Sequence, residues 1–314
     1  MHILITGGCG YTGTVLTNKL LSFGYKVTVI DTQWFGNHLQ PKPKLKIIKL
    51  DIRNSDQIPF DNVDVLIHLA NIANDPGVEL NPLLSWEINV LATHQLIENA
   101  IKNNVKQFIY ASSGSVYGIK KEQEVTEDLP LVPISTYNKT KMIAEKVLSS
   151  YKNLIKFHCI RPATVCGYSP KMRLDLSVNL FTIQALKNKE LTVFGGNQIR
   201  PNIHIEDLVD VYIHFIKNPN LPNGFYNAGF ENLKIIDIAK KVSEIIPSKI
   251  KIQQNNSDPR SYRQNSDKLI LTGFKKNFSI SNAIVDLKKK YEEKKFFETD
   301  ECYTVRSMKK LNIK

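Results

Sequence analysis

Short apolar runs recur along the first half of the chain, and the residues between them carry apolar positions at helical spacing. The first run, residues 2–6, has the length and composition of a buried parallel strand. Helical spacing is clearest at 82–103 and 134–151. This alternation predicts an α/β fold, with a Rossmann-type doubly wound parallel sheet. Further strands are predicted at 26–30, 46–50, 63–70, 107–112 and 156–160.

Beyond Pro162 the alternation is less regular. We interpret residues 1–165 as the larger domain and 166–314 mainly as a smaller C-terminal α/β domain that binds the substrate. Residues at about 201–217 are expected to pack back onto the larger domain. The smaller domain is predicted to contain helices near 176–188 and 235–246, a strand at 191–194, a strand and helix across 199–217, and a basic C-terminal helix.

Three glycines, Gly7, Gly10 and Gly13, lie between the first strand and the helix that follows it. Glycines at this spacing allow a tight turn, a close approach of backbone to a diphosphate, and packing of helix on strand. The helix N-terminus adds free N–H groups and a positive dipole end. Asp31, at the end of the second strand, can accept hydrogen bonds from a ribose and would repel a 2′-phosphate. These features favour NAD(H) over NADP(H); the alternative is a glycine-rich turn in some other α/β protein.

Composition narrows the class of protein. The chain has 314 residues, of which 42% are hydrophobic and 23% charged, as in soluble globular proteins. No apolar run approaches the roughly 20 residues that span a bilayer, and the apolar N-terminal residues belong to the first strand rather than to a signal peptide. The four cysteines lack the spacing of a zinc site. We therefore expect a cytoplasmic protein without a membrane partner or a metal.

A formal net charge of +12 raises the question of nucleic-acid binding. The Lys and Arg residues, however, are spread along the chain and are densest in its last thirty residues. A phosphate-bearing small substrate and a solvated basic surface account for such a distribution. We therefore expect no nucleic-acid partner.

Tyr137 and Lys141 lie four residues apart on a predicted helix, so their side chains share one face. An ammonium beside a phenol lowers the phenol pKa from about 10, which makes it a general base for a sugar hydroxyl. The same spacing occurs at Tyr117 and at Tyr291. Only Tyr137 begins a helix that follows the fifth strand, and it is therefore the candidate base.

Ser113 comes directly after the fifth strand, at the sheet edge where doubly wound folds bind ligands. Its hydroxyl can hold the reacting oxygen against Tyr137. Ser112 and Ser115 are alternatives for this role, and an ordinary turn serine is the remaining interpretation.

Together, TGGCGYTG, Asp31, FIYASSGSVYG, YNKTK and RPNIHIED closely resemble the extended short-chain dehydrogenase/reductases, in particular the nucleotide-sugar epimerase/dehydratase branch. The resemblance covers essentially the whole chain. It implies bound NAD, a catalytic triad of Ser113, Tyr137 and Lys141, and a homodimer formed by the helices at 82–103 and 134–151.

The resemblance also assigns binding residues. Asn179 corresponds to a nucleotide contact and Arg200 to a diphosphate contact, while Ser113 would also touch the substrate. Asp258, Arg260 and Arg263 resemble the segment that grips base and ribose in GDP-mannose dehydratases, which slightly favours a GDP-sugar; solvated loop charge is the alternative. The cofactor residues would be Gly7, Gly10, Tyr11, Thr12, Gly13, Asp31, Asp51, Ile52, Leu69, Ala70, Asn71, Tyr137, Lys141, Pro162 and Ala163.

Departures from the family pattern narrow the reaction. The 4,6-dehydratases carry an Asp–Glu pair where this chain has Gly114 and Ser115, and the 3,5-epimerase/reductases carry Cys at Ser115. With dehydration and 3,5-epimerisation disfavoured, the expected reaction is hydride transfer alone. Our hypothesis is an NAD-dependent 4-dehydrogenase or 4-epimerase of a nucleotide-activated hexose or heptose. A nucleotide 4-keto-sugar reductase would use the same residues. A non-catalytic NAD-binding regulator is the alternative of another class, although such a protein is expected to lack the Tyr or the Lys.

Overall fold

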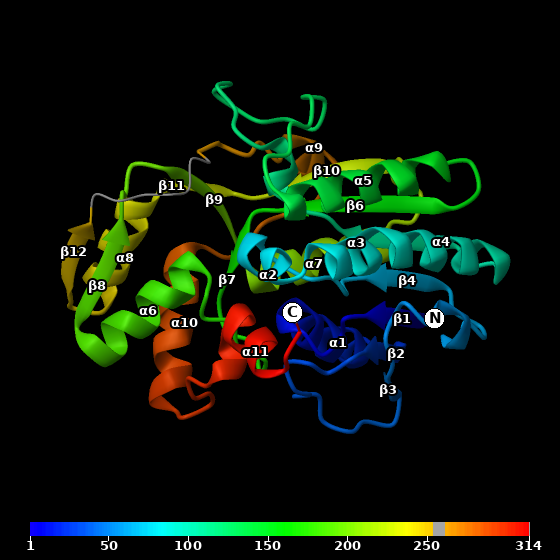
Figure 1. Cartoon of the computed structure of the whole chain (residues 1–314), viewed down its shortest axis with the longest axis horizontal. Helices are drawn as coiled ribbons and strands as arrows, with labels where there is room; N and C mark the ends of the chain where they lie inside the picture. The colour runs from blue at the N-terminus through cyan, green and yellow to red at the C-terminus, as the bar shows by residue number, and fades with distance from the viewer. Residues whose placement is uncertain (254–260, 314) are drawn as a thin grey trace.

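A seven-stranded sheet forms the centre of the larger part of the molecule (Figure 1). The computed structural model describes residues 1–253 and 261–313. All strand pairs in this sheet are parallel, in the order β10-β6-β5-β4-β1-β2-β3. The predicted Rossmann-type fold is confirmed. The strands are β1 (His2–Thr6), β2 (Lys26–Asp31), β3 (Leu45–Lys49), β4 (Val65–His68), β5 (Gln107–Ala111), β6 (Lys156–Pro162) and β10 (Gly224–Ala228).

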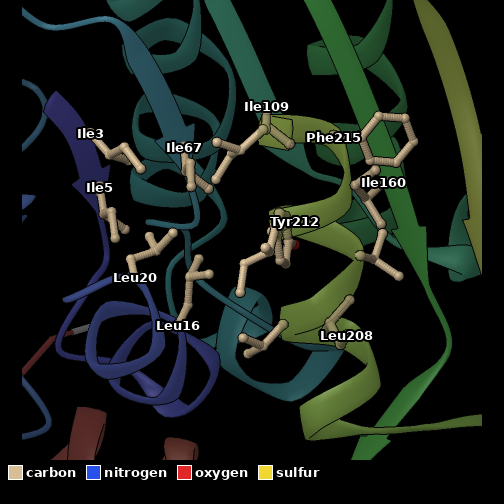
Figure 2. Packing of buried hydrophobic residues seen from close by; sticks show 14 of the residues in the cluster. Ile3, Ile5, Leu16, Leu20, Ile67, Ile109, Ile160, Leu208, Tyr212 and Phe215 are labelled. Carbon is tan, nitrogen blue, oxygen red and sulfur yellow. The ribbon is translucent and has the colours of Figure 1, made fainter. Parts of the chain in front are cut away.

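Helices cover both faces of this sheet because successive strand residues point to opposite sides. Ile3 and Ile5 of β1 pack beneath α1 (Tyr11–Ser22) and α7 (Ile205–Lys217), as Figure 2 shows. Leu4, between them, belongs to the opposite cluster under α4 (Ala92–Lys102) and α5 (Thr136–Ser150). Two apolar layers therefore fix the strand ends from which the site is built.

The helix predicted across 82–103 is interrupted. It consists of α3 (Pro82–Trp86), a π-helical turn at Glu87–Leu91, and α4. In this turn, Asn89 accepts a hydrogen bond from Ile72 N (2.9 Å) and donates to Ile72 O (3.2 Å). The extra residue of a π-turn directs this side chain to the loop after β4. The spacing of apolar residues does not predict where a helix contains the extra residue of a π-turn.

The smaller part of the molecule holds two short sheets, a third apolar cluster and three helices (Figure 1). In the first sheet, β9 (Ile199–His204) pairs with β11 (Glu231–Lys234) and β7 (Thr164–Cys166). In the second, β8 (Glu190–Phe194) pairs with β12 (Lys249–Gln253). The helices are α6 (Ser177–Asn188), α8 (Ile235–Ile245) and α10 (Ile280–Glu292).

The chain crosses between the two parts more often than predicted. Of the segment 201–217, α7 packs on α1, whereas β9 remains in a small sheet. In addition, β10 extends the large sheet beside β6. The short helix α9 (Asp267–Leu271) was not predicted, and the basic C-terminal region forms two helices, α10 and α11 (Thr304–Lys310), where one was expected. Across the described residues, no helix has the length and apolar character to cross a membrane.

Candidate functional site

A cavity of about 430 Å³ opens at the carboxyl ends of the sheet strands. This is the volume of a pocket for a small molecule or cofactor, and the position that a doubly wound sheet predicts. The structure brings every predicted cofactor residue to the wall of this one cavity. They are Gly7, Gly10, Tyr11, Thr12, Gly13, Asp31, Asp51, Ile52, Leu69, Ala70, Asn71, Tyr137, Lys141, Pro162 and Ala163.

The backbone around the glycine loop is packed too closely for side chains at Gly7 and Gly13. Gly7 has φ +75°, and a Cβ there would lie 2.5 Å from the Ala70 nitrogen. A Cβ on Gly13 would lie 2.3 Å from the Gly7 carbonyl oxygen. Gly10 is the N-cap of α1 and supplies no side-chain cap. The N–H groups of the first helical turn therefore face the cavity, as a bound diphosphate requires.

Asp31 ends β2 with its carboxylate fixed at the cavity wall. Oδ2 accepts from Cys9 N (2.9 Å) and Oδ1 accepts from Gln33 N (2.7 Å). Burial raises the pKa of Asp31, while these two hydrogen bonds and the charge of Lys171 oppose the rise. Each oxygen keeps acceptor capacity for a ribose hydroxyl.

Asp51 follows β3, and its carboxylate is paired within the protein. Arg53 Nη2 donates to its Oδ2 (2.8 Å), and Arg53 Nη1 reaches Glu87 (2.8 Å). Asp51 therefore lines the cavity with its charge already balanced.

Lys141 and Tyr137 lie one turn apart in α5, which Ser135 caps by accepting from Asn138 N (3.2 Å). Lys141 is 1% exposed. Its Nζ donates to the Ala111 carbonyl (2.7 Å) and lies 4.8 Å from the Tyr110 ring centroid. Burial lowers the pKa of Lys141 to about 7, against the opposing charge of Glu145 on the same helix.

Ser113 is the N-cap of the 3-10 turn Gly114–Tyr117, and its Oγ lies 2.8 Å from the Ser115 Oγ. It lines the cavity together with Tyr137 and Lys141. Ser112 donates its hydroxyl to Glu145 (2.5 Å), which leaves Ser113 as the better placed of the two. No group of three or more His, Cys, Asp or Glu side chains in the described part of the chain could hold a metal.

Of the predicted substrate residues, some line the cavity and others do not. Arg200 lines the cavity. Asn179 does not: it is fully buried, donates to Tyr11 Oη (3.1 Å) and accepts from Gly167 N (3.0 Å). These hydrogen bonds direct the Asn179 side chain to Tyr11 and Gly167, and the structure does not bring it to the cavity wall. Arg263 is exposed outside the cavity, and Asp258 and Arg260 lie outside the described residues.

Several cavity residues were not found from the sequence. Lys171 and Arg173 belong to the irregular segment between β7 and α6, where no periodicity applies. Tyr262 precedes Arg263 in a run that drew attention only for its charges. Two further cavity residues, Thr304 and Met308, come from the C-terminal helix α11.

Comparison with known proteins agrees with this geometry. The model of the NAD dependent epimerase/dehydratase family matches residues 3–229. A UDP-glucose 4-epimerase of Lactobacillus helveticus is 29% identical over 272 residues, which cover 78% of this chain and 82% of the relative. A putative UDP-glucose 4-epimerase of Methanocaldococcus jannaschii is 33% identical over 215 residues, covering 66% and 70%.

Solved structures give the same result. The UDP-glucuronic acid 4-epimerase from Bacillus cereus, in complex with UDP-glucuronic acid and NAD, is 26% identical with a TM-score of 0.80, covering 93% of this chain and 99% of that chain. These names contain UDP, so the slight preference for GDP finds no support. The family match spans most of the chain, and the glycine loop, Asp31 and the three candidate catalytic residues line one cavity. The protein therefore belongs to the NAD-dependent epimerase/dehydratase family, whose enzymes act on nucleotide sugars.

Proposed function

We propose that this enzyme is a 4-epimerase of a UDP-activated hexose. The observation that carries the proposal is the gathering of Ser113, Tyr137 and Lys141 in the same cavity as the glycine loop. The names of the relatives support both the reaction and the UDP moiety. A net 4-dehydrogenase or a 4-keto-sugar reductase would use the same three side chains.

When bound, NAD would serve as the acceptor for a hydride from C4 of the sugar and could return that hydride. Ser113 Oγ holds the oxygen of the sugar 4-hydroxyl, and Tyr137 takes its proton. The positive charge of Lys141 stabilises the phenolate form of Tyr137. Tyr137 returns the proton to the same oxygen after the sugar has been reduced on its other face, so no net proton is consumed.

The chain has no carboxylic acid at Gly114 or Ser115, where the 4,6-dehydratases carry the Asp–Glu pair that eliminates water. A Cβ on Gly114 would lie 3.1 Å from Gln264 Oε1 and 3.2 Å from Tyr262 Oη. The space beside Ser113 is therefore too tight for an added carboxylate without movement of these neighbours. This packing supports epimerisation over dehydration.

The test uses the purified enzyme. The nicotinamide that it releases on denaturation is identified, and fresh enzyme is incubated with UDP-glucose, UDP-N-acetylglucosamine, UDP-glucuronic acid and GDP-mannose. We expect NMR to show C4 epimers of a UDP-sugar without a lasting rise in NADH absorbance. Tyr137→Phe should abolish turnover, whereas Tyr291→Phe, the same change outside the cavity, should leave it intact.

Other outcomes would contradict the proposal in distinct ways. Accumulating NADH would indicate net dehydrogenation, and conversion of GDP-mannose alone would overturn the nucleotide assignment. Bound nicotinamide without product from any sugar would favour the non-catalytic regulator.

A further inference from the structure

Lys171 lies beside the glycine loop although it is far from it in sequence. Its segment, between β7 and α6, crosses the N-terminus of α1. Tyr11 Oη donates to the Gly167 carbonyl (2.6 Å), and Ser169 Oγ donates to the Tyr11 carbonyl (2.8 Å). These two hydrogen bonds fix the segment against the first residue of α1.

The Lys171 side chain is a buried cation that lines the cavity. It is 4% exposed, and its Nζ lies 4.8 Å from the Phe35 ring centroid. Nζ donates to the Glu301 carbonyl (3.1 Å). In the described ranges no carboxylate oxygen comes within 4.0 Å of it, whereas the neighbouring Arg173 pairs with Asp175 at 2.8 Å.

A desolvated ammonium without a counter-ion is costly. Burial and the nearby Arg173 charge lower the pKa of Lys171 to about 8, although the carboxylate charges of Asp175 and Glu301 oppose this shift without contacting its ammonium. An anion entering the cavity at this point would relieve the cost. The molecule therefore holds a preformed position for negative charge at the end of the cavity that contains Asp31 and the glycine loop.

The other cationic side chains that line the cavity are Lys141, Arg173 and Arg200. Lys141 donates to Ala111 at the end of β5. Arg173 pairs with Asp175, and Arg200 comes from β9 in the smaller part. The glycine loop itself contributes N–H groups and a helix dipole but no cationic side chain. We propose that Lys171 is a cofactor-binding residue that pairs with the diphosphate of NAD held at the glycine loop.

The C-terminal segment holds Lys171 in this position. The Glu301 carbonyl accepts from its Nζ, and Thr304 N donates to Asp175 Oδ2 (3.2 Å). The segment also packs on α2 (Asp75–Leu80), where a Cβ at Gly77 would lie 3.4 Å from Thr304. The C-terminal segment therefore contacts both the Lys171 side chain and the segment that carries it.

The experiment compares Lys171→Met and Lys171→Arg with the wild type and with Lys102→Met, an exposed lysine on α4 as the matched control. NAD release from the holoenzyme is followed after dilution, and stripped protein is titrated with adenosine, ADP and 2′-AMP. We expect Lys171→Met to release NAD about ten to a hundred times faster and to bind ADP weaker by a similar factor. Adenosine binding should not change, and Lys171→Arg should retain most of the affinity.

Equal losses for adenosine and ADP would mean that Lys171 only shapes the cavity, and unchanged ADP affinity would overturn the proposal outright. A loss confined to 2′-AMP would place the lysine at the ribose instead and would also overturn it. Lys171→Gln serves if the Met variant does not fold. The proposal rests on NAD as the cofactor and not on the sugar, so this test and the epimerase assay fail separately.

Discussion

Lys141 is the group through which pH acts most directly on the site. Its pKa of about 7 means that it loses its proton as pH rises through neutrality, and the charge that favours the Tyr137 phenolate is lost with it. In Lys141→Met this charge is absent at every pH, so the Tyr137 pKa should return toward about 10. We expect kcat/KM at pH 7 to fall about a hundredfold or more and to recover partly near pH 10.

The pH profile of kcat/KM measures this shift. Lys139→Met removes an exposed lysine of the same helix and should leave the profile unchanged. A rising limb at the same pH in Lys141→Met and wild type would show that Lys141 does not tune Tyr137.

A single residue was predictable where its position depends only on the neighbouring sequence. Tyr137 and Lys141 follow from helical spacing, and Asp31 from its place after a strand. The direction in which a side chain points also depends on contacts with residues that are distant in sequence. Asn179 turns away from the cavity to bind Tyr11, whereas Lys171, in a segment without periodicity, turns into it.

At the scale of elements, one buried ion pair joins α5 to the ends of β5 and β6. Arg161 Nη2 donates to Glu145 Oε2 (2.7 Å), and the two side chains are 3% and 1% exposed. Glu145 also accepts from Ser112, the residue before Ser113. The pair thus connects the elements that carry the triad.

Glu145→Gln should destabilise the protein by about 3–5 kcal/mol, because it leaves the Arg161 charge buried without its partner. Urea unfolding at pH 7 measures the free energy of unfolding. Glu145→Gln/Arg161→Met should recover part of the loss, and the exposed Glu244→Gln should have little effect. A Glu145→Gln loss below about 1 kcal/mol would contradict the assigned role of the pair.

Six strands and the helices between them were predictable because apolar periodicity is a property of short segments. Other elements were not predicted, because tertiary contacts determine them. For example, the π-turn at Glu87–Leu91 places Asn89 against Ile72, and the five-residue strand β10 depends on the free edge of β6.

At the scale of the molecule, we expect two copies of the chain to pair through α3, α4 and α5. Leu83 and Leu91, in the first two segments of the interrupted helix, are 71% and 58% exposed. Light scattering should give twice the chain mass of 35.8 kDa for the wild type. Leu83→Glu/Leu91→Glu should give the monomer, because two charges would be buried at the interface. Leu271→Glu, at a residue 86% exposed on α9, should remain dimeric, and a monomeric wild type would contradict the expectation.

The position of β10 has a consequence for how the protein can be re-engineered. Because this strand completes the cofactor sheet from the second half of the gene, residues 1–165 alone would expose the edge of β6 as a template for aggregation. Chimaeras joined near residue 165 would exchange that strand together with the cavity residues beyond the junction, such as Lys171 and Arg200. New specificity is therefore better sought by point changes around the cavity than by grafting whole modules between relatives.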